Sequence, residues 1–287
     1  MSDVARGRRR IRLIGVGPGD PDQVTLEAVR AMREVDFFVV SDKSPRGGMP
    51  DPLVHARERM LDRHLGALPG GRRAVVVRVE DPERERRVDR TASPADYEAV
   101  VASWHEARAL AFEEALLAHE GDAGFLVWGD PAFYDSTIRV VERVLARGRV
   151  DAEVDVVPGI SSLQLLAARH RIVLHEVGQP LHVTTGRRLR EAVEQGQDNL
   201  VVMLNRRLEL DGLEEWRIWW GANLGTPTEE LVAGRVGDVL DGIEAARERA
   251  RGAAGWVMDV FLLRRVSAGS TGEAGSAGSI DGAGAGR

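Results

Sequence analysis

Short apolar runs alternate with segments of helical periodicity through the first 170 residues of the chain. The apolar runs are typical of strands covered on both faces of a parallel sheet. They lie at residues 11–15, 36–40, 74–79, 123–128 and 154–157. Apolar side chains at helical spacing predict helices that begin at Val24, span 53–65 and 96–120, begin near Tyr134 and end at Ala168. Repetition of strand, turn and helix requires parallel strands with right-handed crossovers. We therefore predict a doubly wound α/β domain over residues 11–175.

The pattern changes after this point and predicts a second, smaller α/β domain over residues 176–266. Strand candidates lie at residues 181–185, 200–205, 216–222 and 256–263, and helix candidates at 187–195, 226–233 and 236–249. The sequence does not decide whether the last two strands form a hairpin or flank helices. Residues 1–10 form a basic arm. Residues 267–287 are Gly, Ala and Ser with scattered charge, and are expected to be a disordered tail because they cannot bury enough apolar surface.

The first apolar run leads into a glycine-rich turn, IRLIGVGPGDPD, at residues 11–22. A dinucleotide fingerprint needs its third glycine where this chain has Asp20, and the Gly-Lys-Ser/Thr end of a phosphate loop is missing. Carboxylates at the N-terminus of the next helix would also repel a pyrophosphate. The turn therefore favours a ligand without phosphates. Asp22 is alternatively a helix N-cap, with Leu26, Val29 and Met32 on the buried side.

Two later apolar runs also end in turns that contain glycine and proline. The turns are Gly-Asp-Pro at 129–131 and Pro-Gly at 158–159, with Ser161 and Ser162 behind the second. If the three strands are neighbours, their loops open on one edge of the sheet, where α/β sheets bind ligands. Small residues would let a flat ligand approach the backbone closely. The pattern predicts a binding crevice at this edge.

Composition narrows the choice of ligand. The formal charge is −6, with 39 basic and 45 acidic residues, which argues against nucleic acid as a partner. No apolar run reaches the roughly 18 residues of a membrane helix, and no signal peptide is recognisable. We expect a cytoplasmic protein that does not bind membranes. The chain has no cysteine, and its histidines and carboxylates lack metal-site spacing, so no metal is expected.

Four segments, taken in order, closely resemble the tetrapyrrole (corrin/porphyrin) methylase family, which methylates uroporphyrinogen and the precorrins. These segments are IRLIGVGPGDP, WGDPAFY, VVPGISS and VVMLN. The resemblance covers nearly the whole chain. It implies a class III methyltransferase, with two α/β domains and S-adenosylmethionine in the cleft between them, and a homodimer. By analogy the cofactor-binding residues are Pro18, Gly129, Asp130, Ala132, Ser161, Ser162, Met203 and Leu204. Asp135 stands where many members have glycine, so contacts there should differ.

Within the family, the chain is most similar to the branch that methylates precorrin-5 at ring carbon C-1 and releases acetate. The segments that carry this similarity include VDFFVVSDK, HVTTGRRL and VMDVFLLR. Loss of an acetyl group requires a water and a base that takes its proton. The candidate catalytic residues are Asp42, Asp135 and Tyr134, with His175, Glu176 and His182 as further candidates. Arg46, Arg187 and Arg188 are candidates for binding the carboxylates of a precorrin, because guanidinium forks match carboxylates.

Three alternatives remain open on the sequence. One is another enzyme of the same fold, either a precorrin or uroporphyrinogen methylase that acts at a different ring position or an rRNA ribose methylase. The excess of acidic residues argues against an RNA substrate. Another is a protein that binds a small ligand between two domains without chemistry. A nicotinamide-dependent dehydrogenase is disfavoured by Asp20.

Overall fold

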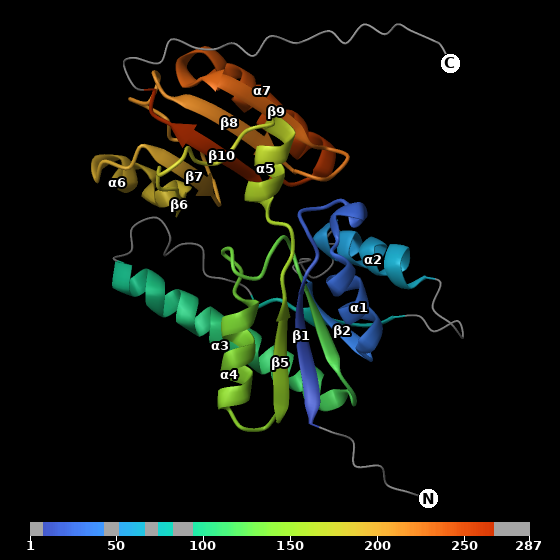
Figure 1. Cartoon of the computed structure of the whole chain (residues 1–287). Helices are drawn as coiled ribbons and strands as arrows, with labels where there is room; N and C mark the ends of the chain where they lie inside the picture. Colours follow the sequence, from blue (N-terminus) through green and yellow to red (C-terminus); the bar gives the residue numbers. More distant parts are fainter. Residues whose placement is uncertain (1–7, 43–51, 67–73, 83–93, 267–287) are drawn as a thin grey trace, which may run out of the picture.

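The computed structural model describes residues 8–42, 52–66, 74–82 and 94–266, which form two α/β units (Figure 1). Arg46 and the predicted tail lie outside the described residues. Five parallel strands form the first sheet in the order β3-β2-β4-β1-β5. Their bounds are β1 (Arg9–Gly15), β2 (Phe37–Asp42), β3 (Val75–Glu80), β4 (Ala123–Val127) and β5 (Ala152–Val157). The predicted parallel sheet is confirmed, and β1 lies between β4 and β5.

Helices cover both faces of this sheet (Figure 1). One face carries α1 (Leu26–Glu34) and α2 (Pro52–Leu65), and the other carries α3 (Pro94–Ala118) and α4 (Thr137–Ala146). Successive side chains of β1 point to opposite faces: Leu13 packs in one apolar cluster with Phe112 of α3, and Ile14 packs in another with Met32 of α1. Burial on both faces explains the apolar runs of the inner strands β1, β2 and β4, whereas the edge strands β3 and β5 are mostly half-buried or exposed.

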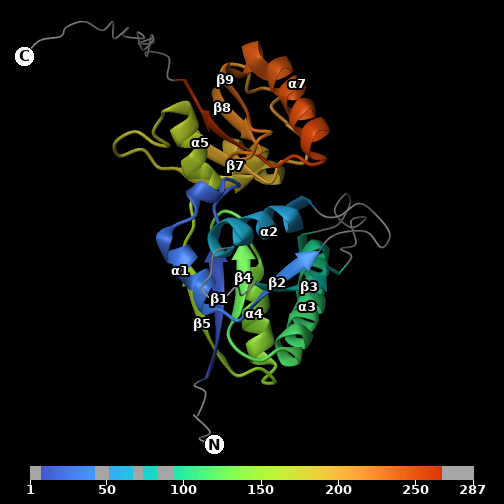
Figure 2. The same cartoon turned by 90° about the vertical axis from the view of Figure 1, so that its right-hand side faces the viewer.

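The second unit is a mixed sheet in the order β6-β7-β10-β8-β9. Its strands are β6 (His182–Thr185), β7 (Asn199–Met203), β8 (Arg217–Ala222), β9 (Glu230–Arg235) and β10 (Asp259–Arg264). Strands β6 and β7 are parallel, and the other pairs are antiparallel. Figure 2 shows α5 (Ser162–His170) and α7 (Val236–Ala254) on opposite sides of this sheet, and α6 (Leu189–Glu194) packs on the side of α7.

Helix α5 packs with the second sheet and not with the first. Leu163 and Leu166 share an apolar cluster with Val201, Trp219 and Leu262. The sequence placed this helix in the first domain, with the boundary at residue 175. By packing, the chain crosses between the two units in the segment 158–161, directly after β5. The third predicted ligand loop is therefore also the connection between the units.

Two local expectations were wrong. Residues 226–233 were expected to be helical, but β9 begins at Glu230 and pairs antiparallel with β8. Its alternating half-buried and exposed side chains are typical of a strand at a sheet edge.

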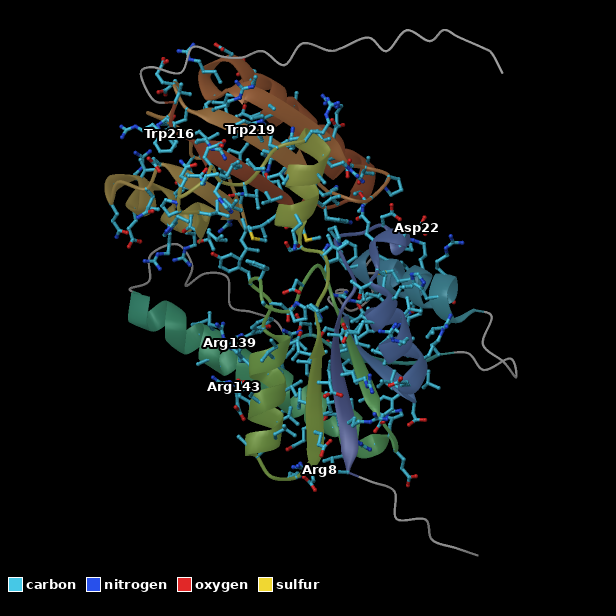
Figure 3. The ribbon with its side chains drawn as sticks, viewed as in Figure 1. Arg8, Asp22, Arg139, Arg143, Trp216 and Trp219 are labelled. Atoms are coloured by element: carbon cyan, nitrogen blue, oxygen red, sulfur yellow. The ribbon has the colours of Figure 1, made fainter. Side chains whose placement is uncertain are left out.

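Asp22 does not cap α1. Asp20 accepts a hydrogen bond from the backbone of Asp22 in a short 3-10 turn, and Thr25 caps α1 through Ala28 N. Because α1 begins later than expected, Leu26 lies in its first turn and is 78% exposed. Asp22 is instead on the side of the first unit that faces the second (Figure 3).

His170 at the end of α5 makes stability depend on pH. Its Nε2 lies 3.0 Å from the carbonyl oxygen of Trp220, and burial lowers the pKa of the imidazole. The folded chain therefore favours neutral His170, whereas the unfolded chain takes up a proton below about pH 6.5. This contribution to stability is complete above that pH and decreases as the pH falls through it. In urea unfolding at about pH 8 and about pH 5.5, we expect His170→Gln to lose less stability on acidification than the wild type. An equal loss in both proteins would contradict this role of His170.

Candidate active site between the two units

The loops after β1 and β4 hydrogen-bond to each other across the edge of the first sheet. Gly17 N donates to Gly129 O at 3.2 Å, and Gly129 N donates to Gly17 O at 2.8 Å. Both glycines have positive φ, +75° and +71°, which other residues adopt only at a cost. The GPGDP and GDP turns therefore form one paired backbone surface.

Asp130 joins this pair to the loop after β5. Its Oδ2 accepts a hydrogen bond from Gly159 N at 2.9 Å, and its Oδ1 accepts one from Ala132 N at 2.8 Å. The backbones approach so closely that a Cβ on Gly159 would lie 2.3 Å from Gly129 O and 2.9 Å from Gly15 Cα. The three predicted turns are thus one structure, which we call the glycine rim: residues 15–19, 129–132 and 158–161.

The glycine rim leaves space for a ligand at Gly129. This residue is buried, but a Cβ built on it would meet no atom of the described residues within 4 Å. At Gly15 and Gly159, by contrast, a Cβ would clash with the rim itself. Gly129 therefore presents backbone to an open space, which fits a ligand that makes close contact with the main chain.

The second unit closes on the glycine rim. A Cβ on Gly19 would lie 2.7 Å from Thr226 Cγ2 and 3.0 Å from Gly225 O, both in the loop between β8 and β9. The rings of Trp128 and Trp256 meet edge to face, with centroids 6.4 Å apart. The rim therefore lies at a junction with the second unit.

A cavity of about 200 Å³ lies between the two units beyond the GDP turn. Tyr134 contributes one wall, and the other walls are β6 and α6, with His182, Thr185 and Arg188. The Tyr134 hydroxyl lies 3.4 Å from the carbonyl oxygen of Val183, and Tyr134 itself has φ +52°. The helix α4 was expected to begin near Tyr134. Tyr134 precedes that helix and is 45% exposed.

The environment of Tyr134 fixes its protonation state. Partial burial raises the pKa of the Tyr134 hydroxyl, against a smaller opposing effect of the Arg188 guanidinium. The hydroxyl is therefore protonated at neutral pH and can donate a proton but cannot act as a base. Arg188 is exposed and forms two hydrogen bonds to Glu191, at 2.9 Å and 2.8 Å.

A second cavity of about 190 Å³ lies inside the first unit, at the carboxyl ends of β2 and β4. Tyr134 lines this cavity too, together with Asp135, Ser136, Ser41 and Arg108. Asp135 Oδ1 accepts a hydrogen bond from Thr137 N at 2.6 Å, in the first turn of α4. We call this space the inner cavity.

The structure brings five of the eight predicted cofactor residues together in the glycine rim: Pro18, Gly129, Asp130, Ala132 and Ser161. Ser161 and Ser162 begin α5, and the Ser161 hydroxyl donates to Gln164 Oε1 at 2.7 Å. Met203 ends β7, and Leu204 follows it with φ +55° and 62% exposure. Backbone strain at an exposed apolar residue such as Leu204 is typical of a ligand-binding position.

The other predicted residues are spread more widely. Asp42 ends β2, and its carbonyl oxygen accepts a hydrogen bond from Asp81 N at 2.9 Å. Arg187 is exposed beside Arg188. Glu176 pairs with Arg264, which lies opposite the first residue of β7. Met203 is the last residue of that strand, so Glu176 and its neighbour His175 lie at the opposite end of β7 from the predicted cofactor residue.

Sequence reasoning missed Arg108, the buried cation of the inner cavity. It lies in the middle of α3, where helical spacing of apolar residues indicated a core face. Among the described residues, no group of three or more side chains is arranged to hold a metal ion. None of the helices in those same ranges is long and apolar enough to cross a membrane.

Comparison with known proteins agrees with this geometry. Residues 10–240 match the family described as Tetrapyrrole (Corrin/Porphyrin) Methylases. A precorrin-6A synthase [deacetylating] from Sinorhizobium sp is 40% identical over 265 residues, which cover 90% of this chain and 96% of that protein. The crystal structure of a cobalamin synthesis related protein (CobF) from Corynebacterium diphtheriae has 32% identity and a TM-score of 0.73, covering 91% and 100% of the two chains.

More distant structures share the fold. Uroporphyrin-III C-methyl transferase from Thermus thermophilus, complexed with S-adenosyl homocysteine, is 22% identical with a TM-score of 0.50, and the match covers 89% of this chain and 97% of that one.

Proposed function

The chain belongs to the tetrapyrrole (corrin/porphyrin) methylase family and is a methyltransferase of cobalamin biosynthesis, and we propose that it is a deacetylating precorrin-6A synthase. In this proposal it methylates precorrin-5 at ring carbon C-1 and releases acetate. The match to the Sinorhizobium synthase supports the proposal because it covers nearly all of both chains. The fold alone would not distinguish this reaction from other methylations.

The glycine rim is the observation that carries the proposal. It offers a paired backbone surface, open space at Gly129 and no phosphate-binding signature, which suits S-adenosylmethionine. We assign the cofactor to this rim, which includes Ser161, and to Ser162, Met203 and Leu204. When bound, it supplies an electrophilic methyl group on a sulfonium. The related structure with S-adenosyl homocysteine supports this choice of cofactor at the level of the fold.

The chain's own contribution to methyl transfer is to position the reactants and to exclude water, since the displacement needs no enzyme nucleophile. Asp130 fixes the rim by binding two backbone N–H groups. The contacts of Gly19 with Gly225 and of Trp128 with Trp256 hold the second unit against it. We assign substrate entry to the side of Tyr134, where the cavity between the units lies.

We assign the substrate's carboxylates to Arg187 and Arg188, and to Arg46 outside the described residues. Arg188 stands at the wall of the interdomain cavity opposite Tyr134, and its guanidinium already binds a carboxylate, that of Glu191. A precorrin carboxylate would take the place of Glu191 or share the guanidinium with it. We also propose a cytoplasmic homodimer, as the family resemblance implies. Its mass in solution tests the dimer.

The test is anaerobic incubation with precorrin-5 and methyl-labelled S-adenosylmethionine, followed by mass spectrometry of the tetrapyrrole and measurement of acetate. We expect the product to gain one labelled methyl group and lose one acetyl group. Gain of a methyl group without loss of acetyl would exclude the deacetylating assignment and favour another methylase of the family. Cofactor binding with no change in the tetrapyrrole would indicate a binding protein.

A further inference from the structure

The inner cavity contains a buried cation that the assigned binding sites do not use. Arg108 is 8% exposed, and its Nε lies 2.8 Å from Asp81 Oδ1. Its guanidinium stacks on Trp104 at 4.7 Å from the ring centroid and lies 5.2 Å from the centre of Phe112. Ion pairing and ring stacking fix the plane and position of this guanidinium.

Arg108 holds two serine hydroxyls side by side at the cavity wall. Nη1 donates to Ser136 Oγ at 2.7 Å, and Nη2 donates to Ser41 Oγ at 2.9 Å. Each hydroxyl oxygen accepts a hydrogen bond, so its hydrogen remains available as a donor. Within residues 8–42, 52–66, 74–82 and 94–266, neither hydroxyl donates to a protein group. A hydroxyl that accepts from a cation is also a stronger donor.

The charges around the cavity favour a neutral ligand oxygen over a carboxylate. Arg57 and Arg108 bring two positive charges, and Asp81 and Asp135 bring two negative charges. A carboxylate would leave an uncompensated charge in a largely buried space. A carbonyl oxygen enters neutral and gains negative charge only when a nucleophile adds to the carbonyl carbon. Two fixed hydroxyl donors are suited to that developing charge.

Asp135 can accept a proton at the same cavity. Its Oδ1 is bound to Thr137 N, and its Oδ2 accepts no hydrogen bond from the described residues. A cavity of about 190 Å³ is large enough for an acetyl group together with a water molecule. Donors, a base and space for water are therefore present in one place.

We propose that the inner cavity is the deacetylation site, in which Ser41 and Ser136, held by Arg108, bind the acetyl carbonyl oxygen of the tetrapyrrole. This assignment rests on the proposed function. Water oxygen bonds to the acetyl carbon while Asp135 takes one water proton. The bond between the acetyl carbon and the ring carbon then breaks and acetic acid leaves, after which acetic acid and Asp135 each release one proton to solvent. The electron pair stays on the ring carbon, which is the nucleophile that methylation needs.

The test is single-turnover kinetics with precorrin-5 and S-adenosylmethionine, with acetate and methylated product measured separately. We expect the double variant Ser41→Ala/Ser136→Ala to release acetate about 100-fold more slowly than the wild type. The variant Ser41→Thr/Ser136→Thr keeps both hydroxyls and is expected to stay within about tenfold. Asp135→Asn keeps the size of the side chain but cannot take the proton, so it should also slow acetate release by at least about 100-fold.

Binding of S-adenosylmethionine alone, measured by calorimetry, is expected to be unchanged in all these variants, because none of the substituted side chains belongs to the glycine rim. Ser103→Ala, at an exposed hydroxyl of α3 next to Trp104, is the matched control and should behave as wild type.

If the wild type releases acetate and the folded double alanine variant does so equally fast, the deacetylation site is elsewhere while the proposed function stands. An equal slowing in the alanine and threonine variants would show that acetate release depends on the shape of the cavity wall and not on its hydroxyls, and would overturn the assignment. If the wild type releases no acetate from precorrin-5, the proposed function fails, and this assignment fails with it.

Discussion

Gly159→Ala is expected to weaken binding of S-adenosylmethionine about 100-fold, although it adds a single methyl group. The new Cβ would lie 2.3 Å from Gly129 O and 2.8 Å from the carbonyl carbon of Gly15. All these neighbours are backbone atoms, which cannot rotate away as a flexible side chain can. The loop after β5 must therefore move outward, away from the pair formed by Gly17 and Gly129. Calorimetric titration of the variant with the cofactor measures the effect.

Gly242→Ala is the matched control for this substitution. Gly242 lies in α7, where an added Cβ would meet no described atom within 4 Å. We expect unchanged cofactor binding and a gain of about 0.5–1 kcal/mol in stability, because alanine is the better helix former. If Gly159→Ala folds and binds the cofactor as tightly as Gly242→Ala does, the glycine rim is not the cofactor site.

Asp130→Ala should weaken cofactor binding about 30-fold, which corresponds to about 2 kcal/mol. The carboxylate accepts hydrogen bonds from Gly159 N and Ala132 N, and its removal leaves both donors without their partner. The loop after β5 then loses its link to the GDP turn. The effect on the fold should be smaller, because the strands β1, β4 and β5 keep their own hydrogen bonds.

Asp130→Asn is the informative comparison in the same titration. The amide keeps one oxygen acceptor but presents an NH₂ group where the second acceptor was. We expect its affinity to lie between those of the wild type and of Asp130→Ala. Equal affinity in all three proteins would show that the link between the loops does not support cofactor binding.

The glycine rim was predictable because it depends on a general property of parallel sheets. Strands that run parallel end at one edge, so three turns after three apolar strands can meet if the strands are neighbours. The sequence showed the turns, and the structure shows that β4, β1 and β5 are adjacent. The hydrogen bonds between Gly17 and Gly129 follow from that adjacency.

Features that depend on distant partners could not be predicted in the same way. Helix α5 has an apolar face that suits either sheet, and only the packing of Leu166 against the second sheet decides its domain. The segment that forms β9 has a strand's alternation, but its pairing partner β8 is needed to distinguish it from a helix. In the sequence, Arg108 cannot be distinguished from an ordinary charged residue of α3. Its partners Ser41, Asp81 and Ser136 come from three distant segments, and only the fold brings them around it.

The most direct test of the account is a crystal structure of the chain with S-adenosylhomocysteine. We predict that the ligand lies in the cleft between the two units, against the backbone of Gly129 and Ala132, with Met203 and Leu204 on its other side. A ligand bound outside the cleft, without contact to any of the three loops of the glycine rim, would contradict the account.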